Sequence, residues 1–155
     1  MRTPYTKAVA QDLIHARVNL ALAAGSVPPY AHLCFHAEQA AQNALRAVLA
    51  SQGPSVTHGL SLEELVELVP RGLAPAGLLE SVKDLSVFAL WIISPSERWQ
   101  VRQEQYRHAL SLARDVVAWA ERVVLGGLPH GDVGAPASSG ALASLPARPV
   151  ARLQR

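Results

Sequence analysis

The stretch Leu33-Cys-Phe-His-Ala-Glu-Gln-Ala-Ala-Gln-Asn-Ala-Leu-Arg-Ala-Val-Leu49 decides the fold that we expect for this chain. Nearly all of its residues favour or tolerate a helix. Its polar side chains, with one just before it, recur at spacings of four and three residues, which places them on one line of an α-helix. This polar stripe consists of His32, His36, Gln39, Asn43 and Arg46. The remaining surface is small and apolar and can pack closely, so we look for function first along the stripe.

The composition bounds the class of protein. The chain has 155 residues, of which 50% are hydrophobic and 5% aromatic. This is enough for one domain with its own core and favours helices over strands. The single cysteine, Cys34, excludes an internal disulfide, and its apolar neighbours favour a core thiol over a nucleophile. No signal sequence begins the chain, and no run approaches about 18 apolar residues. We expect a cytoplasmic protein that does not enter a membrane.

The formal charge of +2 comes from the C-terminal segment. Residues 1–125 contain 11 Lys and Arg and 11 Asp and Glu, whereas residues 126–155 contain three arginines and one aspartate. A neutral domain has no overall attraction for a polyanion. Nucleic-acid binding would therefore need a local patch, which the sequence does not indicate.

Capping residues, prolines and glycines divide the first 125 residues into five predicted helices. These helices span about residues 3–24, 26–52, 61–70, 75–93 and 96–125. Ser61-Leu-Glu-Glu64 is a capping box that starts the short third helix. Gly53-Pro54 and Gly126-Gly127 end the second and the last helix.

The predicted fold is an all-α antiparallel up-and-down bundle of four long helices plus one short crossover helix. No alternation typical of strands persists, and short connections favour antiparallel neighbours. The bundle occupies residues 1–125. Residues 126–155 are rich in Gly, Pro and Ala and have little periodicity, so we expect this tail to be disordered.

Three groups of residues could carry chemistry. His32 and His36 are one helical turn apart and could share a metal ion. The third ligand and the glutamate that usually accompany such a pair are absent. A polar groove is therefore favoured, and no metal site is assigned. Arg102 and His108 could hold a phosphate and move a proton in a metal-independent ribonuclease. Their six-residue separation leaves the side chains about 120° apart on a helix, so they would converge only with a partner subunit or a distorted turn. His58 is expected to fix a turn.

Two motifs resemble the HEPN domain family (higher eukaryotes and prokaryotes nucleotide-binding). The first is Phe35-His-Ala-Glu-Gln39-Ala-Ala-Gln-Asn-Ala-Leu-Arg46-Ala-Val-Leu49, and the second is Thr57-His58-x-Leu60. The family typically shows Phe-x-x-Gln-Gln-Ala-Ala-Glu-Lys-Ala-Leu-Lys-Ala-Leu-Leu and then Thr-His-Asp-Leu. Small residues at helical spacing in the last predicted helix match as well. The resemblance covers about residues 8–125.

The resemblance implies a four- to five-helix bundle, commonly a homodimer. Such proteins are often encoded beside a small nucleotidyltransferase as a toxin–antitoxin pair. Active members are metal-independent RNases whose Arg-x4–6-His motif faces a cleft between subunits, and other members are proposed nucleotide binders. The Arg102 to His108 spacing satisfies that motif formally.

This chain departs from the family pattern where charge would hold a phosphate. Gln42 and Asn43 replace Glu and Lys, and Gly59 replaces Asp. Ile92-Ile93-Ser94-Pro95 stands where the related branch has Arg-Tyr-Pro. These losses favour a binding or interaction protein over an enzyme.

Three hypotheses follow. The first is a HEPN-like interaction protein that is a homodimer, has no cofactor, and binds a nucleotide or works with a nucleotidyltransferase in a toxin–antitoxin-like module. Its ligand groove would be lined by His32, His36, Gln39, Asn43, Arg46 and His58. The second is an RNase toxin that acts on RNA with Arg102 and His108 at a dimer interface. The third is a purely structural bundle.

Overall fold

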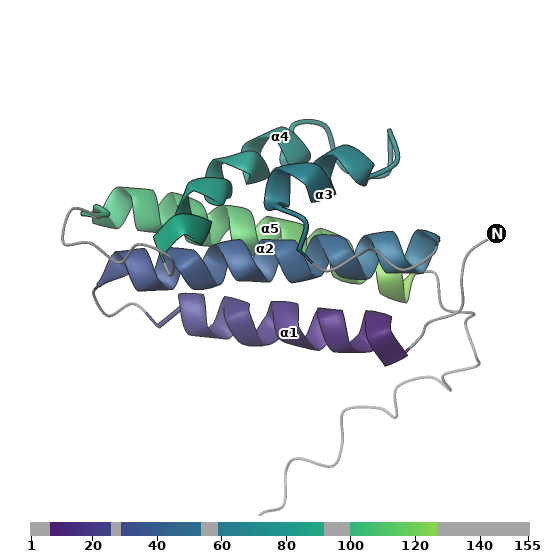
Figure 1. Ribbon diagram of the computed structural model, residues 1–155, viewed down its shortest axis with the longest axis horizontal. Coiled ribbons are helices and arrows are strands. Elements are labelled where there is room, and N and C mark those ends of the chain that lie inside the picture. The colour runs from purple at the N-terminus through teal and green to yellow at the C-terminus, as the bar shows by residue number, and fades with distance from the viewer. Residues whose placement is uncertain (1–6, 26–28, 54–58, 92–99, 127–155) are drawn as a thin grey trace, which may run out of the picture.

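A computed structural model of the protein describes residues 7–25, 29–53, 59–91 and 100–126. Every element that it contains there is helical, which confirms the all-α bundle (Figure 1). Three long helices are α1 (Lys7–Ala23), α2 (Tyr30–Gln52) and α5 (Gln103–Leu125). Three shorter elements lie between α2 and α5: α3 (Leu62–Leu68), α4 (Leu78–Val82) and the 3₁₀-helix η1 (Lys83–Trp91). The predicted tail, residues 126–155, lies outside the described residues except for Gly126.

Helix α2 is the centre of the bundle. It packs along α1 and α5 and also contacts α3 and η1. Figure 1 shows α1 on one side of the α2–α5 pair and the α3–α4 segment on the other. Many buried residues of α2 are alanines, whose short side chains let neighbouring backbones approach closely. They are Ala31, Ala37, Ala40, Ala41, Ala44 and Ala47.

Two tyrosines and a tryptophan connect separate elements of the bundle through a ring contact and hydrogen bonds. The rings of Tyr30 and Tyr106 stack with their centroids 5.0 Å apart. The Tyr106 hydroxyl donates a 2.7 Å hydrogen bond to the carbonyl of Ala23, at the end of α1. Trp119 of α5 is buried, and its indole N–H donates to the Leu73 carbonyl at 3.1 Å. These bonds satisfy polar groups that would otherwise be buried without partners.

The capping box at Ser61 is confirmed. The Ser61 hydroxyl accepts a hydrogen bond from the Glu64 backbone N–H at 3.2 Å, and the Glu64 carboxylate accepts one from the Ser61 N–H at 2.7 Å. Helix α3 starts where the sequence predicts because both backbone donors have side-chain partners.

The segment predicted as one helix over residues 75–93 is divided in the structure. Gly77, with φ of 79°, precedes a five-residue α4, and the chain then continues as nine residues of 3₁₀-helix. A 3₁₀-helix has three residues per turn, so side chains three apart share one face. Val82, Leu85 and Phe88 have this spacing, and all three pack against the core. Tertiary packing therefore selects the tighter helix here.

The last helix begins later than predicted. Residues 100–102 are not helical, and α5 starts at Gln103, where the Gln105 side chain accepts a 2.9 Å hydrogen bond from the Arg102 N–H. Ser96, the predicted cap, lies outside the described residues, as do residues 1–6 at the predicted start of the first helix.

Candidate functional site

The polar face of α2 has two parts with different surroundings. At its N-terminal end, His32 is exposed and His36 is half-buried. Further along, Asn43 is buried, and so are two neighbours outside the predicted stripe, Glu38 and Gln42. Gln39 and Arg46 are intermediate in exposure. The five residues of the polar stripe therefore do not form one continuous groove.

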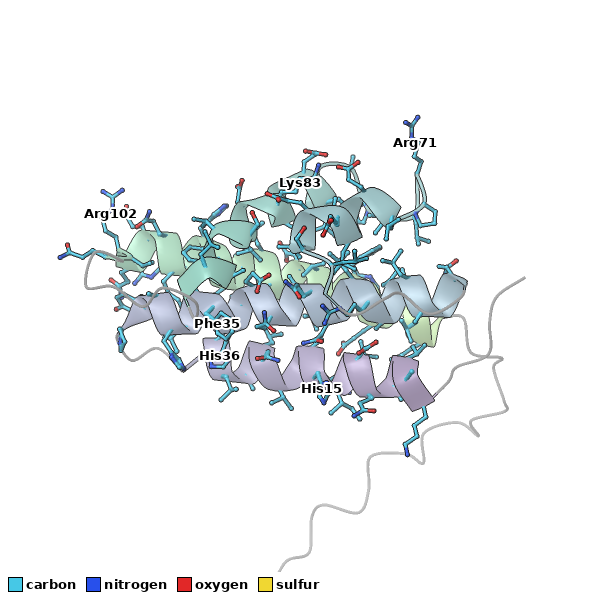
Figure 2. All side chains as sticks on the ribbon, viewed as in Figure 1. His15, Phe35, His36, Arg71, Lys83 and Arg102 are labelled. Atoms are coloured by element: carbon cyan, nitrogen blue, oxygen red, sulfur yellow. The ribbon has the colours of Figure 1, made fainter. Side chains whose placement is uncertain are left out.

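The exposed part is a histidine pair, His32 and His36, held by α1. The two Nε2 atoms lie 3.0 Å apart. His36 Nδ1 lies 3.0 Å from the side-chain oxygen of Asn19, and the Asn19 amide group donates to the His15 carbonyl at 3.0 Å. Figure 2 shows His36 where α2 faces α1.

These hydrogen bonds assign the protons of the neutral pair. Asn19 uses its N–H group on His15, so its oxygen accepts from His36, which must carry its proton on Nδ1. The Nε2 lone pair of His36 then accepts from the N–H of His32. Burial lowers the pKa of His36, and the neighbouring His32 lowers it further, so His36 is neutral at pH 7.

The buried part is a ladder of three side chains at four-residue spacing, Glu38, Gln42 and Arg46. The Gln42 amide donates to the Glu38 carboxylate at 2.6 Å, and its oxygen accepts from Arg46 Nη2 at 3.1 Å. Gln39 donates to the second Glu38 oxygen at 2.8 Å. Gln42 thus connects a carboxylate to a guanidinium two turns away.

Glu38 is the residue that the sequence-based interpretation missed. Its exposed fraction is 0%, and burial raises the pKa of its carboxyl group. Hydrogen bonds from Gln39 and Gln42 and the positive charge of Arg46 act in the opposite direction. Spacing in the sequence does align Glu38 with Gln42 and Arg46, which follow at two successive four-residue steps on one line of a helix, but it does not report that Glu38 is buried.

Arg46 is the last residue of the ladder, and one of its buried N–H donors makes no hydrogen bond. Among the described residues, its Nε is buried and has no hydrogen-bond partner. Asn43, the next stripe residue, is turned inward to the helix and donates to the Gln39 backbone carbonyl at 2.9 Å. A buried N–H without an acceptor is uncommon in folded proteins and costs free energy. Arg46 Nε is therefore a buried donor for which the described residues supply no acceptor.

Arg102 and His108 are not brought together within one chain. Arg102 precedes the first residue of α5 and points away from the end of the bundle (Figure 2). His108, one and a half turns further on, is exposed, with its Nε2 3.7 Å from the Asp84 carboxylate. In the described part of the chain no hydrogen bond or ion pair joins the two side chains. A shared cleft would need a second chain, as the helical geometry predicts.

The other sequence candidates divide into buried and undescribed residues. Cys34 is fully buried, as predicted, and burial raises the pKa of its thiol to about 12. His58 lies outside the described residues. Over residues 7–25, 29–53, 59–91 and 100–126, no three metal-ligating side chains cluster. None of the described helices is long and apolar enough to cross a membrane.

A separate pocket lies at the turn between α3 and α4. It has a volume of about 320 Å³, and the charged residues Glu67, Arg71 and Glu80 are among those that line it. Arg71 projects from this turn, far from the labelled His36 (Figure 2). No residue of the polar stripe lines the pocket.

Comparison with known proteins identifies the family. A crystal structure of TT1696 from Thermus thermophilus superimposes with a TM-score of 0.65 at 28% identity, covering 76% of this chain and 99% of that one. No curated protein matches the sequence. The HEPN domain family matches residues 7–123, a span that contains α1, α2, α3, α4, η1 and nearly all of α5. Because this match takes in well over half of the chain, the protein belongs to the HEPN domain family.

Proposed function

We propose that this protein is a non-catalytic HEPN protein that binds the phosphate of a nucleotide at Arg46. The observation that carries the proposal is the buried Nε of Arg46, which has no acceptor among the described residues. Phosphate oxygens are strong acceptors and match the planar guanidinium group. A bound phosphate would supply the missing hydrogen bond.

The ladder supports this role by fixing the guanidinium. Gln42 accepts from Arg46 Nη2 and is held in turn by Glu38, so Arg46 is oriented before a ligand arrives. Preorganisation of this kind reduces the entropy lost on binding. Since Glu38 and Arg46 have opposite charges, the site as a whole is close to neutral, and we expect selectivity for a phosphate that contacts Arg46 directly rather than attraction of polyanions.

A thermal-shift panel of nucleoside mono-, di- and triphosphates tests the proposal. We expect at least one nucleotide to raise the Tm of the wild type. Arg46→Lys keeps the positive charge but lacks the Nε donor and the planar fork, so it should lose most of the shift. Arg114→Ala removes an exposed arginine of α5 and serves as the matched control. No shift with any nucleotide, or an equal shift in Arg46→Lys, would contradict the proposal.

We further propose that the protein is a homodimer and acts with a nucleotidyltransferase in a toxin–antitoxin-like module. Three apolar side chains of α1 at four-residue spacing support an interface: Ile14, Val18 and Leu22 are each about half exposed. Light scattering should give twice the chain mass, and Val18→Glu should halve it. Co-expression with a neighbouring nucleotidyltransferase tests the module by co-purification.

The RNase alternative is favoured by one contact. The Asp84 carboxylate lies 3.7 Å from His108 Nε2 and could orient this imidazole. Growth arrest on expression that disappears in His108→Ala would establish this activity on RNA, whereas arrest that persists in His108→Ala would exclude it.

A further inference from the structure

We propose that His32 and His36 form a chelate for a late first-row divalent cation, with Cu²⁺ and Ni²⁺ preferred in geometry over Zn²⁺. The inference is independent of the phosphate site at Arg46. It rests on three observations: the convergence of two ring nitrogens, the anchoring of one ring by α1, and the exposure of the pair.

The two Nε2 atoms are already spaced as a pair of adjacent metal ligands. They are 3.0 Å apart. With metal–nitrogen bonds of about 2.05 Å, this separation gives an angle of about 94° at the metal. Adjacent ligands in square-planar or octahedral sites are about 90° apart, whereas a tetrahedral zinc site would need the nitrogens at about 3.3 Å. The separation of the two nitrogens therefore matches Cu²⁺ or Ni²⁺ more closely than tetrahedral Zn²⁺.

Asn19 fixes the second ring in the required tautomer. Its side-chain oxygen lies 3.0 Å from His36 Nδ1, so the proton is held on Nδ1 and Nε2 carries the lone pair that a metal needs and that accepts from His32 in the metal-free pair. Metal-binding histidines usually donate their other N–H to an oxygen in this way. Asn19 is itself held by the His15 carbonyl, so α1 positions a ligand that belongs to α2.

The proton balance of binding is simple. In the metal-free pair, His32 donates its Nε2 proton to His36. When the metal binds, the neutral His32 ring must move that proton to Nδ1, so that Nε2 can become a ligand. No proton is released in net terms when both rings are neutral.

The site is open rather than closed. His32 is exposed, and the described residues contribute no third ligand. The remaining coordination positions would be filled by water, so the ion should exchange readily. Affinity should follow the general order for nitrogen ligands, with Cu²⁺ above Ni²⁺ and Zn²⁺, and Mn²⁺ weakest.

Calorimetric titration of the full chain with Cu²⁺, Ni²⁺, Zn²⁺ and Mn²⁺ at about pH 7.5 tests the proposal. The expected result is one Cu²⁺ or Ni²⁺ site that is lost in His36→Ala. Asn19→Ala should weaken Ni²⁺ binding by about tenfold, because the ring is no longer oriented. His15→Ala is the matched control, since it removes an exposed histidine of α1 but keeps the backbone carbonyl that holds Asn19.

Nitrogen coupling in the electron paramagnetic resonance spectrum of the Cu²⁺ complex gives a second readout. We expect two equivalent or nearly equivalent imidazole nitrogens in the wild type and in His15→Ala, and not in His36→Ala. Binding of equal strength in wild type and His36→Ala would place the metal on other residues and overturn the proposal. So would the absence of any Cu²⁺ or Ni²⁺ site in a wild type whose helical circular dichroism is intact.

Discussion

The histidine pair and the buried ladder occupy the same helix and use the same four-residue spacing, yet they differ in nearly every property. The histidines lie partly in solvent and bond to each other through their Nε2 atoms. Glu38 lies at 0% exposure and is connected to Arg46 through Gln42. Spacing along a helix determines which side chains can contact one another. The packing of neighbouring helices determines how buried they are, and so how much each contact stabilises or destabilises the protein.

The largest expected effect is a difference in thiol reactivity between the native and the unfolded protein at Cys34, near the N-terminal end of α2. Cys34 is two residues from each histidine but faces the core, and the rise of its thiol pKa from 9.0 to about 12 leaves about 1000-fold less thiolate at pH 8. We expect a thiol reagent to react with the unfolded chain at least about 1000-fold faster than with the native protein. Reaction of native Cys34 at the rate of the unfolded chain would show that this end is not packed as described.

The next largest effect should come from Glu38→Ala. This change leaves amide donors of Gln39 and Gln42 without their acceptor and removes the opposite charge for Arg46. We expect the free energy of unfolding to fall by about 3 kcal/mol in urea denaturation. His32→Ala, on the exposed part of the same face, should change it by less than about 0.5 kcal/mol. Equal losses of unfolding free energy in the two variants would contradict the distinction between the buried ladder and the histidine pair.

Replacing the whole ladder should be less harmful than breaking it. In Glu38→Met/Gln42→Leu/Arg46→Met the ladder is removed as a unit, and only the partly exposed Gln39 amide loses its partner. Well-packed apolar substitutes for buried ion pairs are often neutral or stabilising. We expect this triple variant to recover at least half of the stability lost in Glu38→Ala while losing the nucleotide response. A triple variant less stable than Glu38→Ala would indicate that the ladder is needed for folding itself.

Much of the fold could be predicted from local sequence, but the division of the polar face could not. The Ser61 capping box and the alanine-rich α2 carry their own local signals, and the structure confirms both. The 3₁₀-helix was missed because it depends on the contacts that Val82, Leu85 and Phe88 make with the core. Glu38 was missed for a related reason: its burial depends on neighbouring helices, which spacing along α2 does not report.

One crossed titration tests the central claim, that the polar face of α2 contains two independent binding points. Wild type, His36→Ala and Arg46→Lys are each titrated with Ni²⁺ and with the nucleotide that stabilises the wild type most. We predict that His36→Ala loses Ni²⁺ and keeps the nucleotide response, whereas Arg46→Lys loses the nucleotide response and keeps Ni²⁺ at unchanged affinity. Loss of both ligands in either variant would show a single coupled site, and retention of both in either variant would show that the residue changed there is not a ligand; both results would contradict the account.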